Sequence, residues 1–159
     1  MPTNMSVGAN LSLTGKQDRH GQWSLKAHYA QGTTLPESRK VVRSNGKINL
    51  GHMAMSGDYG PATDISFTIV AVDVKDRNGK EARVVFASPA SAAIGFTPEA
   101  GNEFAHFEEG AGQKSLTFTD ADDVRTQYEY RLTVTCFENG ATTGTPYILD
   151  PPLVNRRDE

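Results

Sequence analysis

The sequence predicts an all-β fold, an antiparallel two-sheet β-sandwich with roughly seven to nine strands and long loops. One observation behind this prediction is the stretch 124–137, in which every second position carries a side chain suited to a strand face. A period of two places those side chains on one side of the pleat. The other observation is that short alternating runs recur between turn residues and that no long amphipathic helix pattern occurs. Since the second face of these runs is polar, antiparallel pairing is favoured over parallel pairing.

The stretch 124–137 is expected to be a long strand that supports the core. Its odd-numbered positions from 125 to 135 are polar, whereas the expected core face carries Val124, Thr126, Tyr128, Tyr130, Leu132, Val134 and Cys136. Because Cys136 lies on that face, we expect it to be a small buried hydrophobic residue and not a nucleophile. Because Cys136 is the one cysteine in the chain, an intramolecular disulfide is impossible and a thiolate zinc site is excluded.

The N-terminal part of the chain is expected to begin with a hairpin. Leu11–Leu13 and Trp23–Tyr29 each alternate with polar residues, and a polar loop separates them. The stretch 31–60 has the least regular pattern, because glycine and proline interrupt short apolar pieces. Within it, Val41-Val42 and the following Asn45-Gly46 favour a hairpin at a sheet edge.

A second strand pattern lies in the middle of the chain. Alternation over 64–74 slips by one residue, with Ile65, Phe67, Ile69 and Ala71 followed by Val72 and Val74. Such a slip predicts a β-bulge. Asn78-Gly79 then favours a type I′ turn, whose two central residues need positive φ, and 83–87 is expected to be the returning strand. The Ala-rich stretch 88–96 is expected to cross from one sheet to the other.

One domain is expected to span residues 1–159. Residues 1–8 are small and polar and are expected to form a flexible lead-in. Residues 150–159 are expected to be a tail, because Pro151 and Pro152 cannot donate a ladder hydrogen bond.

The composition limits the kind of partner. The net charge is −3 and the pI is about 5.8, so the whole chain has no general attraction to nucleic acid or to anionic lipid. No stretch approaches the roughly 20 apolar residues of a membrane helix, and the N-terminus lacks the pattern of a signal peptide. We therefore expect a cytoplasmic protein with a protein partner or copies of itself as partners, while a virion or secretion by another route stays an open alternative.

The segment from Leu116 to Leu149 resembles strands E, F and G of immunoglobulin-like and fibronectin type III-like domains. The resemblance is carried by Leu116 and Phe118, the acidic corner after them, and Tyr128 followed at alternate positions by Tyr130, Leu132 and Val134. In that superfamily a tyrosine at the start of strand F bonds back to the corner before it, and Tyr128 is in the matching place. The resemblance implies a β-sandwich and no particular activity, because this fold hosts many functions.

Neither a metal nor another cofactor is expected. The acidic corner of Asp120, Asp122 and Asp123 is a weak candidate for Ca²⁺, which takes several oxygen ligands, although acidic residues also favour turns because they cap backbone amides. The four histidines share no short metal-ligand spacing. No catalytic residue is expected, since the chain contains no nucleophile motif to nominate one.

Two groups of residues are candidates for binding a ligand or a partner. Arg39, Lys40 and Arg43, with Lys47 nearby, form a local basic cluster around Val41-Val42. This cluster suits a phosphate or an acidic partner, and charges that protect a sheet edge are the alternative interpretation. Phe104, His106 and Phe107 lie among glutamates and suit a protruding binding loop, with packing over one end of the sandwich as the alternative.

The function expected from these observations is that of a non-catalytic protein-binding or self-assembling structural module. An alternative is a sandwich that binds a glycan or a small molecule in the loops 52–59 or 104–109. A third hypothesis is a hydrolase whose site is assembled from distant loops.

Overall fold

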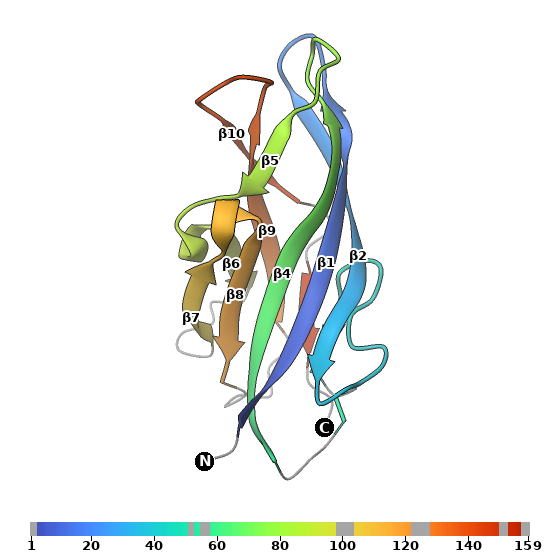
Figure 1. Cartoon of the computed structure of the whole chain (residues 1–159), viewed down its shortest axis with the longest axis vertical. Coiled ribbons are helices and arrows are strands. Elements are labelled where there is room, and N and C mark those ends of the chain that lie inside the picture. Colours follow the sequence, from blue (N-terminus) through green and yellow to red (C-terminus); the bar gives the residue numbers. More distant parts are fainter. Residues whose placement is uncertain are drawn as a thin grey trace.

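The computed structural model describes residues 3–50, 53–54, 58–97, 104–121, 128–149 and 153–156. It is mostly β structure arranged in two sheets (Figure 1), which confirms the all-β prediction. Its helical elements with both ends inside those ranges are the 3₁₀ turns η2 (Ala90–Ala92) and η3 (Ala111–Gln113). The described strands number eleven, more than predicted, and are β1 (Thr3–Gln17), β2 (Trp23–Leu35), β3 (Ile48–Asn49), β4 (Tyr59–Lys75), β5 (Arg83–Phe86), β6 (Ile94–Thr97), β7 (Phe104–Glu109), β8 (Ser115–Asp120), β9 (Tyr128–Phe137), β10 (Thr145–Ile148) and β11 (Leu153–Arg156).

The first sheet has five strands in the order β2-β1-β4-β8-β7. Its long strands β4, β1 and β2 run side by side along the long axis of the molecule (Figure 1). β1 and β2 form the predicted hairpin, but β1 and β4 are parallel from the pair Thr3/Tyr59 to the pair Lys16/Lys75. The prediction of a wholly antiparallel fold is therefore wrong. β2 ends where β1 begins, since Leu35 pairs with Ser6, and β4 starts at the same end, since Tyr59 pairs with Thr3. β4 therefore runs in the direction of β1.

The second sheet is built around β9. β5 and β10 pair with the C-terminal half of β9, β6 and β11 pair with its N-terminal half, and β3 adds to β11 in parallel. The predicted return of 83–87 along the preceding strand is wrong, because a bridge between Lys75 and Glu81 ends that hairpin and β5 joins the other sheet. The chain thus changes sheets before β5, and not within 88–96 as predicted.

The even-numbered face of β9 lies in the core, as predicted. Tyr130, Leu132, Val134 and Cys136 are all at most 1% exposed. The ring of Tyr130 meets that of Phe67 from β4 edge to face, with 5.7 Å between centroids, so the two sheets pack through this face. The side chains of Val124, Thr126 and Tyr128 lie outside the described part of the structure, and so does the predicted corner contact of Tyr128.

The described parts of both predicted terminal segments form β-strands. Residues 3–8, expected to be a lead-in, are the first half of β1, and Met5 and Val7 there are buried. Their small neighbours fit the outer face of the strand, which explains why the stretch looked loose. In the expected tail, 153–156 forms β11 and pairs with β9.

The predicted bulge in β4 is present. The pairing with β1 shifts after Ile69, so that Val70 is the extra residue, and Val70 is 56% exposed. The turn at Asn78-Gly79 differs from the predicted type I′, because Gly79 has positive φ and Asn78 does not. The carboxylate of Asp76 accepts a hydrogen bond from the Asn78 amide, and this local bond favours a turn with negative φ at Asn78.

Side chains join the two sheets along both sides of the molecule. On one side, the Tyr147 hydroxyl of β10 accepts a hydrogen bond from the Leu25 amide (3.1 Å) and donates one to the Leu25 carbonyl (3.3 Å) at the edge of β2. On the other side, the Lys114 ammonium group donates to the Val84 carbonyl at 2.8 Å, and the side-chain amide of Gln113 donates to the carbonyl of Phe86 at 2.9 Å. These contacts satisfy backbone groups that strand edges would otherwise expose.

Truncation of the β9 core face should be strongly destabilising. We expect Leu132→Ala to lower the free energy of unfolding by about 2 to 5 kcal/mol, because it leaves a cavity between two packed sheets. Urea denaturation measures this, with Thr133→Ala on the opposite face as the control, expected to change stability by less than about 1 kcal/mol. Equal effects of the two substitutions would contradict the assignment of the core face.

Removal of one hydroxyl should weaken the contact between β2 and β10. Tyr147→Phe is expected to lower the free energy of unfolding by about 1 to 3 kcal/mol, because it leaves both backbone groups of Leu25 without the partner they have in this structure. The matched control is Tyr59→Phe, since the Tyr59 hydroxyl has no hydrogen bond to the described residues. Urea midpoints that fall equally for both variants would show that the Tyr147 contact adds nothing.

Candidate functional site

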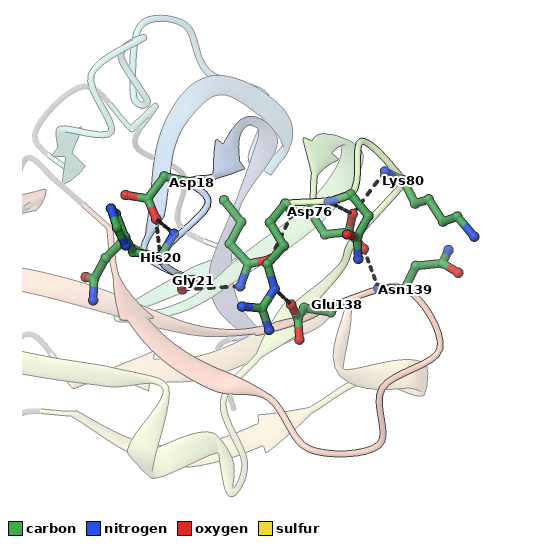
Figure 2. A network of polar contacts seen from close by, with 11 residues as sticks. Asp18, His20, Gly21, Asp76, Lys80, Glu138 and Asn139 are labelled. Carbon is green, nitrogen blue, oxygen red and sulfur yellow. Dashed lines mark hydrogen bonds and ion pairs between the residues drawn. The ribbon is translucent and has the colours of Figure 1, made fainter.

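A network of polar contacts joins three turns of the chain (Figure 2). The turns are 18–22 after β1, 76–80 after β4 and 138–140 after β9. Arg77 connects them, because its Nε lies 2.7 Å from Glu138 Oε1 and its amide donates to Gln17 Oε1 at 3.0 Å. Gln17 in turn donates to the carbonyl of Gly21.

Asp76 is the central carboxylate of this turn cluster. One of its oxygens accepts hydrogen bonds from the amides of Asn78 and Lys80, and the other accepts from the amide of Asn139, all at 2.9 to 3.0 Å. The Asn139 amide is the largest of the contributions that lower the pKa of Asp76. Because backbone donors occupy both oxygens, this carboxylate holds turns together and is poorly placed to accept a substrate proton.

A second aspartate of the cluster has a similar role. Asp18 Oδ1 accepts the amides of His20 and Gln22, at 2.8 and 2.9 Å. This is how an aspartate typically closes a turn. The turn cluster is therefore explained by its structural role alone.

The charge of Asp76 should make stability depend on acid pH. A carboxylate with a lowered pKa stabilises the folded state above its unfolded-state pKa and loses this contribution as pH falls through the folded value. We expect Asp76→Asn to be less stable than wild type above about pH 5, and to lose less stability on acidification below that pH. Urea unfolding over a pH series measures both slopes.

Asp73→Asn is the control for this experiment. Asp73 is exposed on β4 and accepts no hydrogen bond within the described ranges. Its replacement should leave the acid slope close to that of wild type. An unchanged slope in Asp76→Asn would mean that the backbone amides do not stabilise the ionised carboxylate.

The predicted calcium corner is described only at its first residue. Asp120 ends β8 and is buried, with 4% exposed, whereas Asp122 and Asp123 lie outside the described residues. Among the described residues no group of three or more His, Cys, Asp or Glu side chains is arranged to hold a metal ion. Burial raises the pKa of the Cys136 thiol to about 12, so at neutral pH this cysteine is a protonated core residue.

The basic cluster lies on a loop fixed against the edge of β2. We call residues 39–47 the basic loop. Val41 and Val42 are buried and anchor it in the core, and the Gln31 side chain accepts both of their amides, at 2.7 and 3.1 Å. The Tyr29 amide donates to the carbonyl of Ser44. The valines are thus the attachment of the loop, and the predicted hairpin remains only as a bridge between Val42 and Ile48.

The cations of the basic loop project from this fixed backbone. Arg39, Lys40 and Arg43 are exposed, and Lys47 is half-buried. Lys40 has a φ of +58°, a conformation that a residue with a side chain seldom adopts and that its surroundings must hold. A hollow of about 330 Å³ lies between Lys40, Val42, Arg43 and Ser44.

The aromatic group lies on β7, at the opposite edge of the same sheet. Phe104 is buried, and its ring stacks on Phe96 with 4.0 Å between centroids. Phe107 is half-buried and stacks on Phe118. His106 is exposed, with a φ of +58° at an irregularity in the pairing with β8. The two rings therefore pack against the core at the β7 edge of the sheet, and His106 is the member that faces solvent.

The exposed part of β7 is acidic. Glu108 and Glu109 follow the aromatic group and are both exposed. We call His106, Glu108 and Glu109 the acidic edge. In the sequence, the stretch 88–113 contains four glutamates and neither lysine nor arginine, and the stretch 38–57 contains four cations and no carboxylate.

The structure does not bring the two predicted groups together. The basic loop lies beside β2 and the acidic edge lies on β7, and these are the two outermost strands of the five-stranded sheet (Figure 1). Interpretation of the sequence singled out each group, but it included Glu108 and Glu109 only as part of the candidate loop 104–109 and gave their charges no role. The signal that would have found them is the long stretch of one charge sign around each group.

No protein-family model matches the chain, and no curated protein is significantly similar to it. Within the described ranges, no helix has the length and apolar character needed to cross a membrane.

Proposed function

We propose that the protein is a non-catalytic structural module that assembles with copies of itself, the basic loop of one copy contacting the acidic edge of the next. The observation that carries this proposal is the presence of opposite charges at opposite edges of one sheet. The immunoglobulin-like resemblance of the C-terminal part is compatible with this role and implies no other activity.

The fixed backbone of the basic loop favours binding. Its turn is closed by hydrogen bonds between Arg43 and Lys47 and between Gly46 and Arg43, both at 2.9 Å. Because the backbone is already ordered, association must restrict only the ends of the side chains, and this reduces the entropy lost on binding. The hollow beside Lys40 and Arg43 has room for the carboxylate of a neighbouring copy.

The contact would be governed by charge. Exposed ion pairs are individually worth about 0 to 1 kcal/mol, so a few of them give a weak association that several copies must reinforce. Charges of this kind act over a Debye length of about 10 Å at 0.1 M salt. The assembly should therefore be favoured at low ionic strength and should dissociate as salt is added.

The geometry favours a chain of molecules over a closed pair. Two different surfaces meet in each contact, so every open chain keeps one unused basic loop at one end and one unused acidic edge at the other until a ring closes. The expected product is a concentration-dependent series of oligomers.

Charge reversal tests the proposal. In light scattering coupled to size exclusion at low salt, wild type should show oligomers that Arg39→Glu/Arg43→Glu and Glu108→Lys/Glu109→Lys each abolish, because the first change leaves the basic loop with no net charge and the second makes both edges positive. An equimolar mixture of the two variants should associate again, since the unaltered basic loop of the second variant meets the unaltered acidic edge of the first.

The control carries the same change of charge elsewhere. Arg19→Glu/Lys26→Glu alters two exposed cations outside the basic loop and should assemble like wild type. A wild type that stays monomeric at high concentration and low salt would overturn the proposal. So would two charge-reversed variants that do not assemble when mixed.

A further inference from the structure

A second group of cations lies on the outer face of the hairpin formed by β1 and β2. Thr14 is paired with Lys26, and Lys16 is paired with Ser24. All four side chains are exposed, and since paired residues share a face of the sheet, they form a square with a hydroxyl and an ammonium group on each strand. These residues and Gly15 line a hollow of about 330 Å³.

Gly15 sets the backbone beneath the hollow. Its φ is +153°, and a Cβ at this position would overlap the carbonyl oxygen of Ser24 and approach Leu25. The two strands therefore come so close here that only glycine fits. This close approach fixes the positions from which the four side chains project.

The two lysines have no counter-charge of their own. Neither ammonium group forms an ion pair within the described part of the chain. The next strand contributes Lys75 beside Lys16 and Asp73 beside Thr14, and Lys75 is already paired with Glu81 at 3.0 Å. The hollow thus faces more positive than negative charge.

We infer that this hollow binds a tetrahedral oxyanion, the phosphate or sulfate group of a small molecule. Such a group is rich in acceptor oxygens, and the four side chains offer donors from two ammonium groups and two hydroxyls. Diagonal neighbours on paired strands are about 7 to 8 Å apart, so a group placed between Lys16 and Lys26 lies within reach of both. It would also relieve the repulsion between the two cations.

The hollow has room for a small ligand. Its volume of about 330 Å³ is at the lower end of the range for small-molecule sites, roughly 300 to 1,000 Å³. A tetrahedral group with part of the molecule that carries it fills such a space. This site is separate from the surfaces proposed for assembly, so either proposal can fail alone.

Titration with inorganic phosphate and, separately, with inorganic sulfate tests the inference. Both are followed by amide NMR shifts of residues 14–16 and 24–26, at an ionic strength held constant with chloride. We expect saturable shifts, with apparent Kd values about tenfold or more higher in Lys16→Gln and in Lys26→Gln, because each variant loses a charged donor. The anion that binds more tightly identifies the ester to look for.

The matched control is Arg39→Gln/Arg43→Gln, which removes two cations from the basic loop and should leave the shifts at 14–16 and 24–26 unchanged. Ser24→Ala should weaken binding less than either lysine variant, because it removes a neutral donor. Shifts that chloride reproduces at the same ionic strength, or that persist in Lys16→Gln/Lys26→Gln, would overturn the inference.

Discussion

Burial of one face of β9 is the constraint on which the rest of the structure depends. Four short strands from different parts of the chain pair with this strand, β5 and β10 along one half and β6 and β11 along the other. None of the four exceeds four residues, and two short strands alone would be marginal in water. These short strands are therefore stable because the strand they pair with packs Tyr130, Leu132 and Val134 against the five-stranded sheet.

The contacts between the sheets also limit how the molecule can bind another protein. At β2, the Tyr147 hydroxyl accepts the Leu25 amide and the carbonyl of Ser44 accepts the Tyr29 amide. The Gln31 side chain holds the basic loop beside the same strand, because it accepts the amide of Val41. β7 is irregular at His106 and ends in exposed glutamates, a common way to prevent strand addition. With both outer strands protected in this manner, side-chain charge remains as the means by which these edges can recognise a partner.

Prediction from the sequence succeeded where the signal was local. The period of two found the core face at Tyr130 and Leu132, and the slip in β4 found its bulge. The parallel pairing of β1 was missed because alternation does not encode the direction of a neighbouring strand. The basic loop was visible in the sequence, but its distance from Glu108 depends on the order of strands in the sheet, which the sequence did not predict. The hollow at Lys16 was missed for a similar reason, because it depends on which residues of β2 pair with β1.

The parallel pair in the first sheet has a consequence for how the chain folds during synthesis. β1 can pair with β2 as soon as β2 has been synthesised. Its second partner, β4, is complete only when synthesis has reached Lys75. Until then, the β1 edge of the N-terminal hairpin stays unpaired. Asn10 and Leu11, for example, do not yet have their partners Thr68 and Ile69. Pairing over such a separation is slow compared with hairpin formation, so the nascent chain passes through an interval in which this edge is the surface that a chaperone or another chain can reach.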